Sequence, residues 1–337
     1  MIRRLFPALL LASAACVSEQ PPERAAPGAA SAFQPSDAAA ASATGEAYLV
    51  WSADSAGAPA TTVWIDGEGR EVARRPGVLV AAGGGLWAWR EEKERTKGID
   101  CDCLRETEFT DDEQASYRRC TREADVAVVD LVDLLGGRRV RVLDTMSGAD
   151  TLGIEPPEQS SAPLAGVGPF LFTESDSYTY SCGAHGFHGV DAEVYDLLLG
   201  ARVEMMDSVE AEAATAREGA DAIRRMIEED ADLEDPRPVE VVDLTEVEAR
   251  WTPAGKLEVA YQFTTGACYA CGDGLAGSYT RSAVIPAKVL PKRLAEWTTA
   301  PEAVRRYWQS APPGARSGWS RVDAPDRAAA LARFRAP

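Results

Sequence analysis

Three segments of the chain repeat the order strand, glycine turn, strand, and this pattern limits the fold more than any other feature. Each unit has two short runs of β-branched and aromatic residues joined by a turn that contains glycine. Glycine supplies the positive φ that a tight connection between two strands requires. The turns lie at residues 67–69, 136–137 and 199–200. The pattern therefore predicts antiparallel hairpins.

Further runs of aromatic and aliphatic residues, at 48–51, 86–89, 170–172 and 257–261, have the composition of strands. Together with the hairpins they form repeated antiparallel β-meander units. Such repeats are typical of propeller blades, and independent hairpins in an α+β domain would show the same pattern. The predicted fold class is mainly β with late helices (α+β), in a propeller-like array of meander units.

The longest predicted helix covers residues 209–232, near the end of the β-rich domain that we expect over residues 46–300. This segment is rich in alanine and glutamate, and Ile223, Met226 and Ile227 form a sparse apolar stripe along it. A narrow apolar stripe is typical of a surface helix that lies on a sheet.

Two short helices are expected at 287–297 and 301–308, the second opened by a proline. We interpret residues 301–337 as a short helix followed by an arginine-rich tail, which is loosely ordered beyond Pro312. Only residues 327–334 of that tail have the pattern of a brief amphipathic turn.

The chain is acidic, with a formal net charge of −18, but its charge is unevenly distributed. Residues 204–235 carry twelve carboxylates, whereas the last 37 residues carry seven arginines and three acids. An acidic chain repels phosphate backbones, so no nucleic-acid partner is expected.

Six cysteines outside the N-terminal segment predict disulfide bonds: Cys101, Cys103, Cys120, Cys182, Cys268 and Cys271. Cys101 and Cys103 are expected to bond different partners, because cysteines separated by one residue seldom pair. One of them can close a loop with Cys120, and the other can reach Cys182 or the Cys268–Cys271 pair. Cys268 and Cys271 can also bond each other at the tip of a hairpin.

A metal site is the alternative interpretation of these residues. Cys182, His185 and His188 are spaced like ligands, as are Cys268 and Cys271. Together they could give zinc or copper a mixed sulfur and nitrogen shell. An oxidising compartment would instead favour disulfides, so the first prediction includes no cofactor.

Enzymatic signatures are few. The sequence from Cys268 to Cys271 has the C-x-x-C form of a thiol-disulfide oxidoreductase, but no helix is expected to begin at it, as such a site requires. The chain has no nucleophile elbow, no His-Glu-x-x-His and no phosphate loop. A non-enzymatic role is therefore expected.

The first fifteen residues have the pattern of an export signal. Arg3 and Arg4 precede a short apolar run, and Ser13, Ala14 and Ala15 lead into a cysteine. The run is too short to span a bilayer as a permanent helix.

With Cys16, this segment resembles a bacterial lipoprotein signal. The small residues match that family, whereas its leucine three positions before the cysteine is replaced by Ser13. The resemblance covers this segment alone and implies that Cys16 is lipidated. Val17 is not the aspartate of the family's inner-membrane retention signal, which implies the outer membrane rather than the inner one. Ordinary secretion with cleavage at a small-x-small site is the alternative.

Residues 16–45 are expected to be a lipidated cysteine followed by a disordered tether, because they are rich in alanine, proline and serine. The sequence thus predicts an exported, lipid-anchored protein of the cell envelope, with a disulfide-bonded, β-rich body. We expect it to act as a binding or structural module. Its expected partners are the membrane, through the lipid, and another envelope protein or a small ligand.

Overall fold

Strands dominate the chain and form three sheets. The computed structural model describes residues 45–52, 60–106, 118–145, 154–180, 182, 186–229, 242–268, 279–311, 316–325 and 327–336. The predicted signal, Cys16 and nearly all of the predicted tether lie outside these residues.

The largest sheet has eight strands in the order β11-β10-β9-β8-β15-β1-β2-β3. In chain order these strands are β1 (Ala47–Ser52), β2 (Thr61–Asp66), β3 (Glu71–Pro76), β8 (Glu158–Val167), β9 (Phe170–Tyr180), β10 (Gly186–Asp196), β11 (Ala201–Arg202) and β15 (Gly318–Arg321).

The two smaller sheets are fully antiparallel. One has four strands, β4 (Leu79–Ala82), β5 (Gly85–Ile99), β6 (Thr121–Asp133) and β7 (Arg139–Leu143). The other has three strands, β12 (Asp243–Trp251), β13 (Leu257–Cys268) and β14 (Tyr279–Pro286). The described residues also include the helices α2 (Cys101–Glu106), α4 (Val209–Glu229), the 3₁₀ helix η3 (Lys292–Trp297), α5 (Glu302–Ser310) and α6 (Arg327–Arg335).

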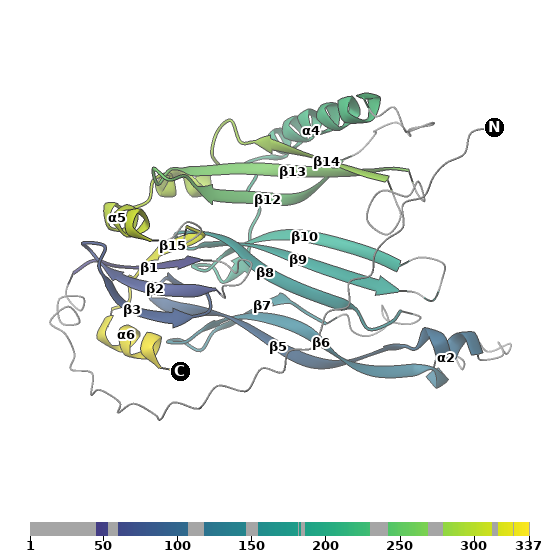
Figure 1. Cartoon of the computed structure of the whole chain (residues 1–337), viewed down its shortest axis with the longest axis horizontal. Helices are drawn as coiled ribbons and strands as arrows, with labels where there is room; N and C mark the ends of the chain where they lie inside the picture. Colours follow the sequence, from purple (N-terminus) through teal and green to yellow (C-terminus); the bar gives the residue numbers. More distant parts are fainter. Residues whose placement is uncertain are drawn as a thin grey trace, which may run out of the picture. The chain divides into compact units, whose positions relative to one another are not determined.

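The eight-stranded sheet packs between the two smaller sheets (Figure 1). Strand β1 shows why, because side chains of a strand alternate between the two faces of a sheet. Tyr48 and Val50 pack in the core shared with the three-stranded sheet, whereas Leu49 and Trp51 pack in the cores on the opposite face. An unbroken apolar strand of this kind is buried on both faces.

Helix α4 covers β13 and β14 of the three-stranded sheet. Gly219, Ile223 and Ile227 recur every fourth residue and are buried, so they form the face that meets the sheet. A Cβ atom on Gly219 would lie only 2.8 Å from the Phe263 ring, so glycine permits this close packing. The described helix ends at Glu229, and residues 230–232 of the predicted segment lie outside the described residues. Met226 does not belong to its buried stripe, because its side chain is 43% exposed.

All three predicted hairpins are present. They join β2 to β3, β6 to β7 and β10 to β11, and their turns contain Gly69, Gly137 and Gly200 with φ of +83°, +71° and +67°. The mainly β fold with late helices is thus confirmed. A propeller is not found among the described strands, because the first and third hairpins lie at opposite ends of one sheet and the second belongs to another.

The C-terminal segment is an integral part of the large sheet, not a loosely ordered tail. Strand β15 inserts between β8 and β1, parallel to β8 and antiparallel to β1. Helix α6 then packs Leu331 and Phe334 against the core formed with β1 and β4. The boundary expected at residue 300 therefore does not separate a tail from the body.

Tryptophans join the late helices to the sheets. The Trp319 ring on β15 lies 5.9 Å from that of Trp251 and 5.5 Å from that of Trp297, measured between centroids. The Trp308 ring of α5 lies 5.8 Å from that of Trp251. The Trp251 indole also donates a 3.0 Å hydrogen bond to the Gly166 carbonyl of β8. These contacts connect the three-stranded sheet to the middle of the eight-stranded one.

The late helices follow the expected order with one difference. Helix α5 matches the predicted 301–308, and α6 matches the amphipathic pattern at 327–334. The helix expected over 287–297 is reduced to η3, because Pro286 and Pro291 interrupt the segment before it.

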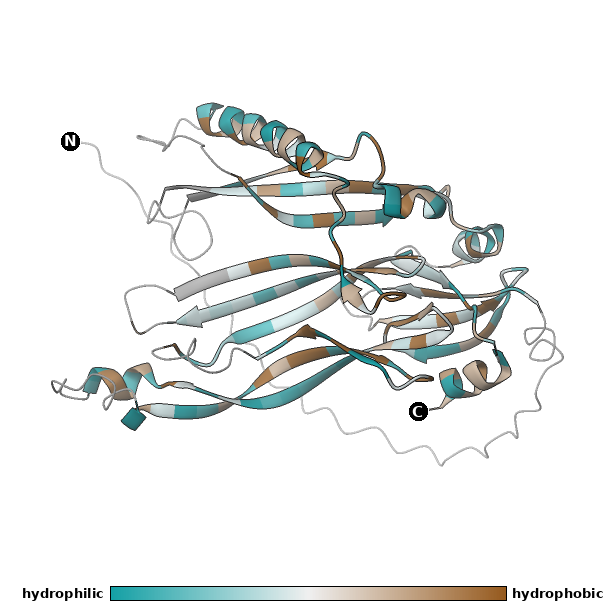
Figure 2. Cartoon of the chain, turned by 180° about the vertical axis from the view of Figure 1, so that it is seen from behind, coloured by the Kyte–Doolittle hydropathy of each residue, from teal (hydrophilic) through white to brown (hydrophobic). Residues whose placement is uncertain are grey.

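Hydrophobic residues gather where the sheets overlap, whereas residues 90–97 of β5 are mostly charged (Figure 2). No helix within the described ranges combines the length and the apolarity that a bilayer crossing requires.

The glycine row beneath Trp51 provides a test of the fold. Trp51 pairs with Gly318, which pairs with Gly166, and a Cβ atom on Gly318 would lie 2.5 Å from the indole. We predict that Gly318→Ala lowers the free energy of unfolding by about 1–3 kcal/mol, since overpacking forces the buried ring to move. Urea denaturation measures this change. Gly67→Ala is the control, because its added Cβ would meet ordinary contacts at 3.4 Å; equal effects of the two variants would contradict the packing argument.

Candidate binding pocket

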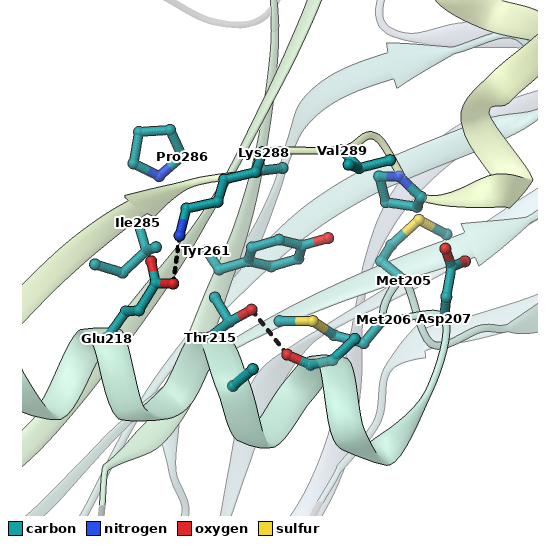
Figure 3. A pocket seen from close by; sticks show the side chains of 14 residues that line it. Met205, Met206, Asp207, Thr215, Glu218, Tyr261, Ile285, Pro286, Lys288 and Val289 are labelled. Atoms are coloured by element: carbon teal, nitrogen blue, oxygen red, sulfur yellow. Dashed lines mark hydrogen bonds and ion pairs between the residues drawn. The ribbon is translucent and has the colours of Figure 1, made fainter.

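A pocket of about 260 Å³ lies between the first turns of α4 and the segment that follows β14 (Figure 3). Tyr261 of β13 lies between these two walls. The described residues that line the pocket are Met205, Met206, Asp207, Ala211, Ala214, Thr215, Glu218, Tyr261, Ile285, Pro286, Ala287, Lys288, Val289 and Pro291.

Local sequence features determine where helix α4 begins and where strand β14 ends, and so where the two walls of the pocket lie. The Ser208 hydroxyl accepts a 3.2 Å hydrogen bond from the Ala211 amide and so caps the start of α4. Glu210 and Glu212 lie in the first turn, where negative charge is favoured by the helix dipole. Proline at 286 ends β14, and the chain then runs along the helix until Pro291.

Most of the lining is apolar. Met205 is buried, and Met206 and Ile285 pack against the same core. Val289 lines the pocket but is 82% exposed. Methionine side chains adapt to the shape of what they contact, as binding surfaces with varied partners require. The lining is therefore suited to receive another apolar group.

The four ionisable side chains among the described lining residues are paired or neutral. Lys288 donates to Glu218 across the pocket, and Asp207 accepts a 2.9 Å hydrogen bond from the Lys292 amide. Burial, and then the nearby Asp207 charge, raise the pKa of Tyr261 to about 12. The phenol consequently stays protonated at physiological pH. These groups can orient a bound group, but none has the arrangement of a nucleophile beside a base.

A second hollow, of about 490 Å³, shares Pro286, Ala287 and Lys288 with the first. The Arg250–Glu258 ion pair, at 2.7 Å, lies among its lining residues. Val284 also lines it and is 47% exposed. The end of β14 and the segment after it thus border two hollows, with Val284 of β14 and Val289 of the following segment as exposed apolar residues.

Three carboxylates meet between β9 and β12. Glu246 is partly buried, and its pKa is raised to about 7 by burial, then by the charges of Glu174 and Glu248. A carboxyl group that titrates near neutral pH can act as a general acid or base in an active site. The pKa of Glu246 is raised by burial and by repulsion from the other two carboxylates. The direct consequence is that the stability of the fold depends on pH.

Four of the predicted disulfide cysteines are bonded. Cys103 bonds Cys120, and Cys101 bonds Cys182, with Cα–Cα distances of 5.4 and 5.0 Å. The first closes the loop between β5 and β6, and the second joins that loop to the connection between β9 and β10. Ile99 and Leu104 are buried around them. Cross-links of this kind stabilise by roughly 2–4 kcal/mol each.

The remaining cysteines and histidines are not brought into a described site. Cys271 and His185 lie outside the described residues, while His188 and Cys268 are described only as backbone positions in β10 and β13. Cys182 is bonded to Cys101, so in this state its sulfur is not a free thiolate ligand. In the described part of the chain no three His, Cys, Asp or Glu side chains form a metal-binding group. The zinc or copper site stays a prediction, as does the Cys268–Cys271 bond.

The sequence did not reveal the pocket. The helix that forms one wall was predicted, but Tyr261 and Lys288 come from segments distant in sequence and belong to no motif. The alternation of apolar residues along 257–263 predicted a strand, and nothing in it distinguished a pocket residue from a core residue.

No protein-family model matches the chain, and no curated protein matches it significantly.

The carboxylate cluster gives a prediction for pH. The pKa of Glu246 is about 7 in the folded protein against an ordinary value of 4.5. Between these values the unfolded chain loses a proton that the folded chain keeps, so stability falls as pH rises through this window. We predict that Glu246→Gln stabilises the protein by about 1–3 kcal/mol at pH 8, allowing for partial exposure, and little at pH 4.5.

Urea denaturation at both pH values measures this difference. Glu228→Gln, on the exposed face of α4, removes the same charge and should change stability little at either pH. A Glu246→Gln effect that is independent of pH would contradict the assignment.

Proposed function

We propose that this chain is an exported, lipid-anchored envelope protein that acts as a non-enzymatic binding module. In this proposal the pocket beside α4 receives an apolar side chain of a partner envelope protein. The observation that carries the proposal is the pocket itself, whose lining is largely apolar and whose ionisable groups are paired or neutral.

Two features support export. The first sixteen residues resemble a lipoprotein signal, and the described body contains two disulfide bonds. Disulfides persist in oxidising compartments outside the cytoplasm. The absence of aspartate at position 17 supports the outer membrane as the location of the anchor.

The size of the pocket favours a side chain over a free ligand. Small-molecule pockets usually enclose roughly 300–1,000 Å³ and bury most of the ligand. This pocket is smaller, at about 260 Å³. Val289, which lines it, is 82% exposed and could contact the surface of a partner. Protein interfaces commonly depend on one or a few side chains that fill such a pocket.

The anchor predicts a specific mass. In protein from its own host, the mature chain should begin at Cys16 and carry two or three acyl chains, as measured by intact mass spectrometry. Cys16→Ser should move the protein from the membrane fraction to the soluble fraction. A mature chain with another first residue and no acyl mass would show ordinary secretion instead.

The pocket predicts where a partner can be captured. A benzophenone amino acid at Val289 should give a discrete protein adduct after irradiation of living cells. Ala214→Trp fills the pocket and should reduce that adduct at least about tenfold, the equivalent of 1.4 kcal/mol.

Ala213→Trp is the matched control. Ala213 is also exposed on α4 but is not among the lining residues, so the adduct should persist. Equal loss in both variants, or equal persistence, would reject the pocket as the binding site.

A further inference from the structure

Four arginines from three elements gather at one end of the body. Arg75 lies on β3, Arg90 on β5, and Arg333 and Arg335 in the last turn of α6. Arg75 is partly buried and the other three are exposed.

Hydrogen bonds from arginine side chains to backbone carbonyls hold this group together. The Arg75 guanidinium donates through Nη1 to the carbonyl oxygens of Arg333 and Phe334, at 3.3 and 3.2 Å. Arg335 donates through Nη2 to the Val72 carbonyl at 3.3 Å. Strand β3 and the end of α6 therefore fix each other, and the side chains of Arg90 and Arg333 remain available to solvent.

The nearest carboxylate in the strand register, Asp130 opposite Arg90, is paired with Arg139 and Arg141 instead. No carboxylate of the described chain lies within ion-pair distance of Arg75, Arg90, Arg333 or Arg335. By contrast, the nearby Arg74 pairs with Glu71 at 2.7 Å. Burial lowers the pKa of Arg75, and the charges of Arg90 and Arg333 lower it further. Like charges held this close repel each other, and a bound anion would relieve that repulsion.

A basic group is unusual in a chain whose formal net charge is −18. Helix α6 itself contains no acidic residue. Because the chain as a whole is acidic and repels anions, the end of the body that carries the four arginines is suited to bind an anion.

The group also lies near the start of the described chain. The Ala47 carbonyl accepts a 2.9 Å hydrogen bond from the Val322 amide, and Ala47 belongs to the same apolar cluster as Leu331 and Phe334 of α6. If residues 17–45 form the tether that their composition predicts, a flexible chain of that length spans on average about 30 Å. A lipid on Cys16 would keep this end of the body close to the membrane surface.

We propose that Arg75, Arg90, Arg333 and Arg335 form a surface that binds the phosphate groups of anionic lipid headgroups. Binding would hold this end of the body against the membrane. The role of this surface in orienting the body rests on the proposed lipid anchor. Its affinity for anionic lipid does not depend on the anchor.

Vesicle sedimentation tests the affinity without the anchor. The chain from Val17 onward keeps every described element and lacks the lipid. In 0.1 M NaCl it should bind phosphatidylcholine vesicles that contain 30% phosphatidylglycerol, and not vesicles of phosphatidylcholine alone. Binding should be lost in 0.5 M NaCl, where surface charges are strongly screened.

Substitution of Arg90 and Arg333 by glutamine locates the binding surface. Neither side chain makes a described hydrogen bond, so the fold should be retained, as checked by circular dichroism and thermal unfolding. Each arginine near an anionic surface contributes about fivefold in affinity, so the double variant should bind roughly 10–30-fold more weakly. Arg217→Gln with Arg225→Gln, on exposed positions of α4, removes the same charge elsewhere and should leave binding unchanged.

Three outcomes would overturn the proposal. They are equal binding to both kinds of vesicle, equal weakening by the two double variants, and binding of millimolar inorganic phosphate by a protein that binds neither kind of vesicle. Failure of the anchor would be seen separately, as an acyl-free mass of the native protein.

Discussion

The packing of tryptophans around β15 is the interaction on which the rest of the structure depends. Strand β15 has only four residues, yet it fills the gap between β8 and β1. Trp51 covers the glycines at positions 318 and 166 on one face, and Trp319 meets Trp251 and Trp297 on the other. Strand β15 thus joins the two halves of the eight-stranded sheet, and its tryptophan contacts add to the packing of β12 on β8, β9 and β10 that attaches the three-stranded sheet.

A second constraint acts at the far ends of the long hairpins. Residues 90–97 of β5 are largely charged, whereas the facing residues 123–130 of β6 include Val126, Val128 and Val129, which are buried, so the two strands contribute unequally to the hydrophobic core. Backbone pairing between β5 and β6 and the Cys101–Cys182 bond to the neighbouring hairpin also hold these ends in place. The pocket lies on α4, β13 and the segment after β14, whereas the arginine surface includes Arg90 of β5, the strand that leads into the cross-linked loop.

Local features were predictable from the sequence, and associations between distant segments were not. The hairpins follow from glycines whose positive φ is needed at one place in the chain, and Cys103 and Cys120 enclose a single loop. Strand β15 gave no such signal, because four residues beginning with Gly318-Trp319 acquire strand character only from the neighbours on either side. The pocket and the arginine surface were missed for the same reason, since Tyr261 and Lys288, or Arg75 and Arg333, meet only after the sheets have assembled.

The pairing of Tyr48 with Arg321 also constrains the order of folding. The partner of β1 is β15, which follows all the other described strands in sequence, so the large sheet has high contact order and cannot close before β15 has been synthesised. Until β15 arrives, β1 and β8 each present an unpaired edge, which is the kind of surface that recruits other chains into aggregates. A chain built in this way would benefit from a chaperone that covers these two edges until β15 is in place.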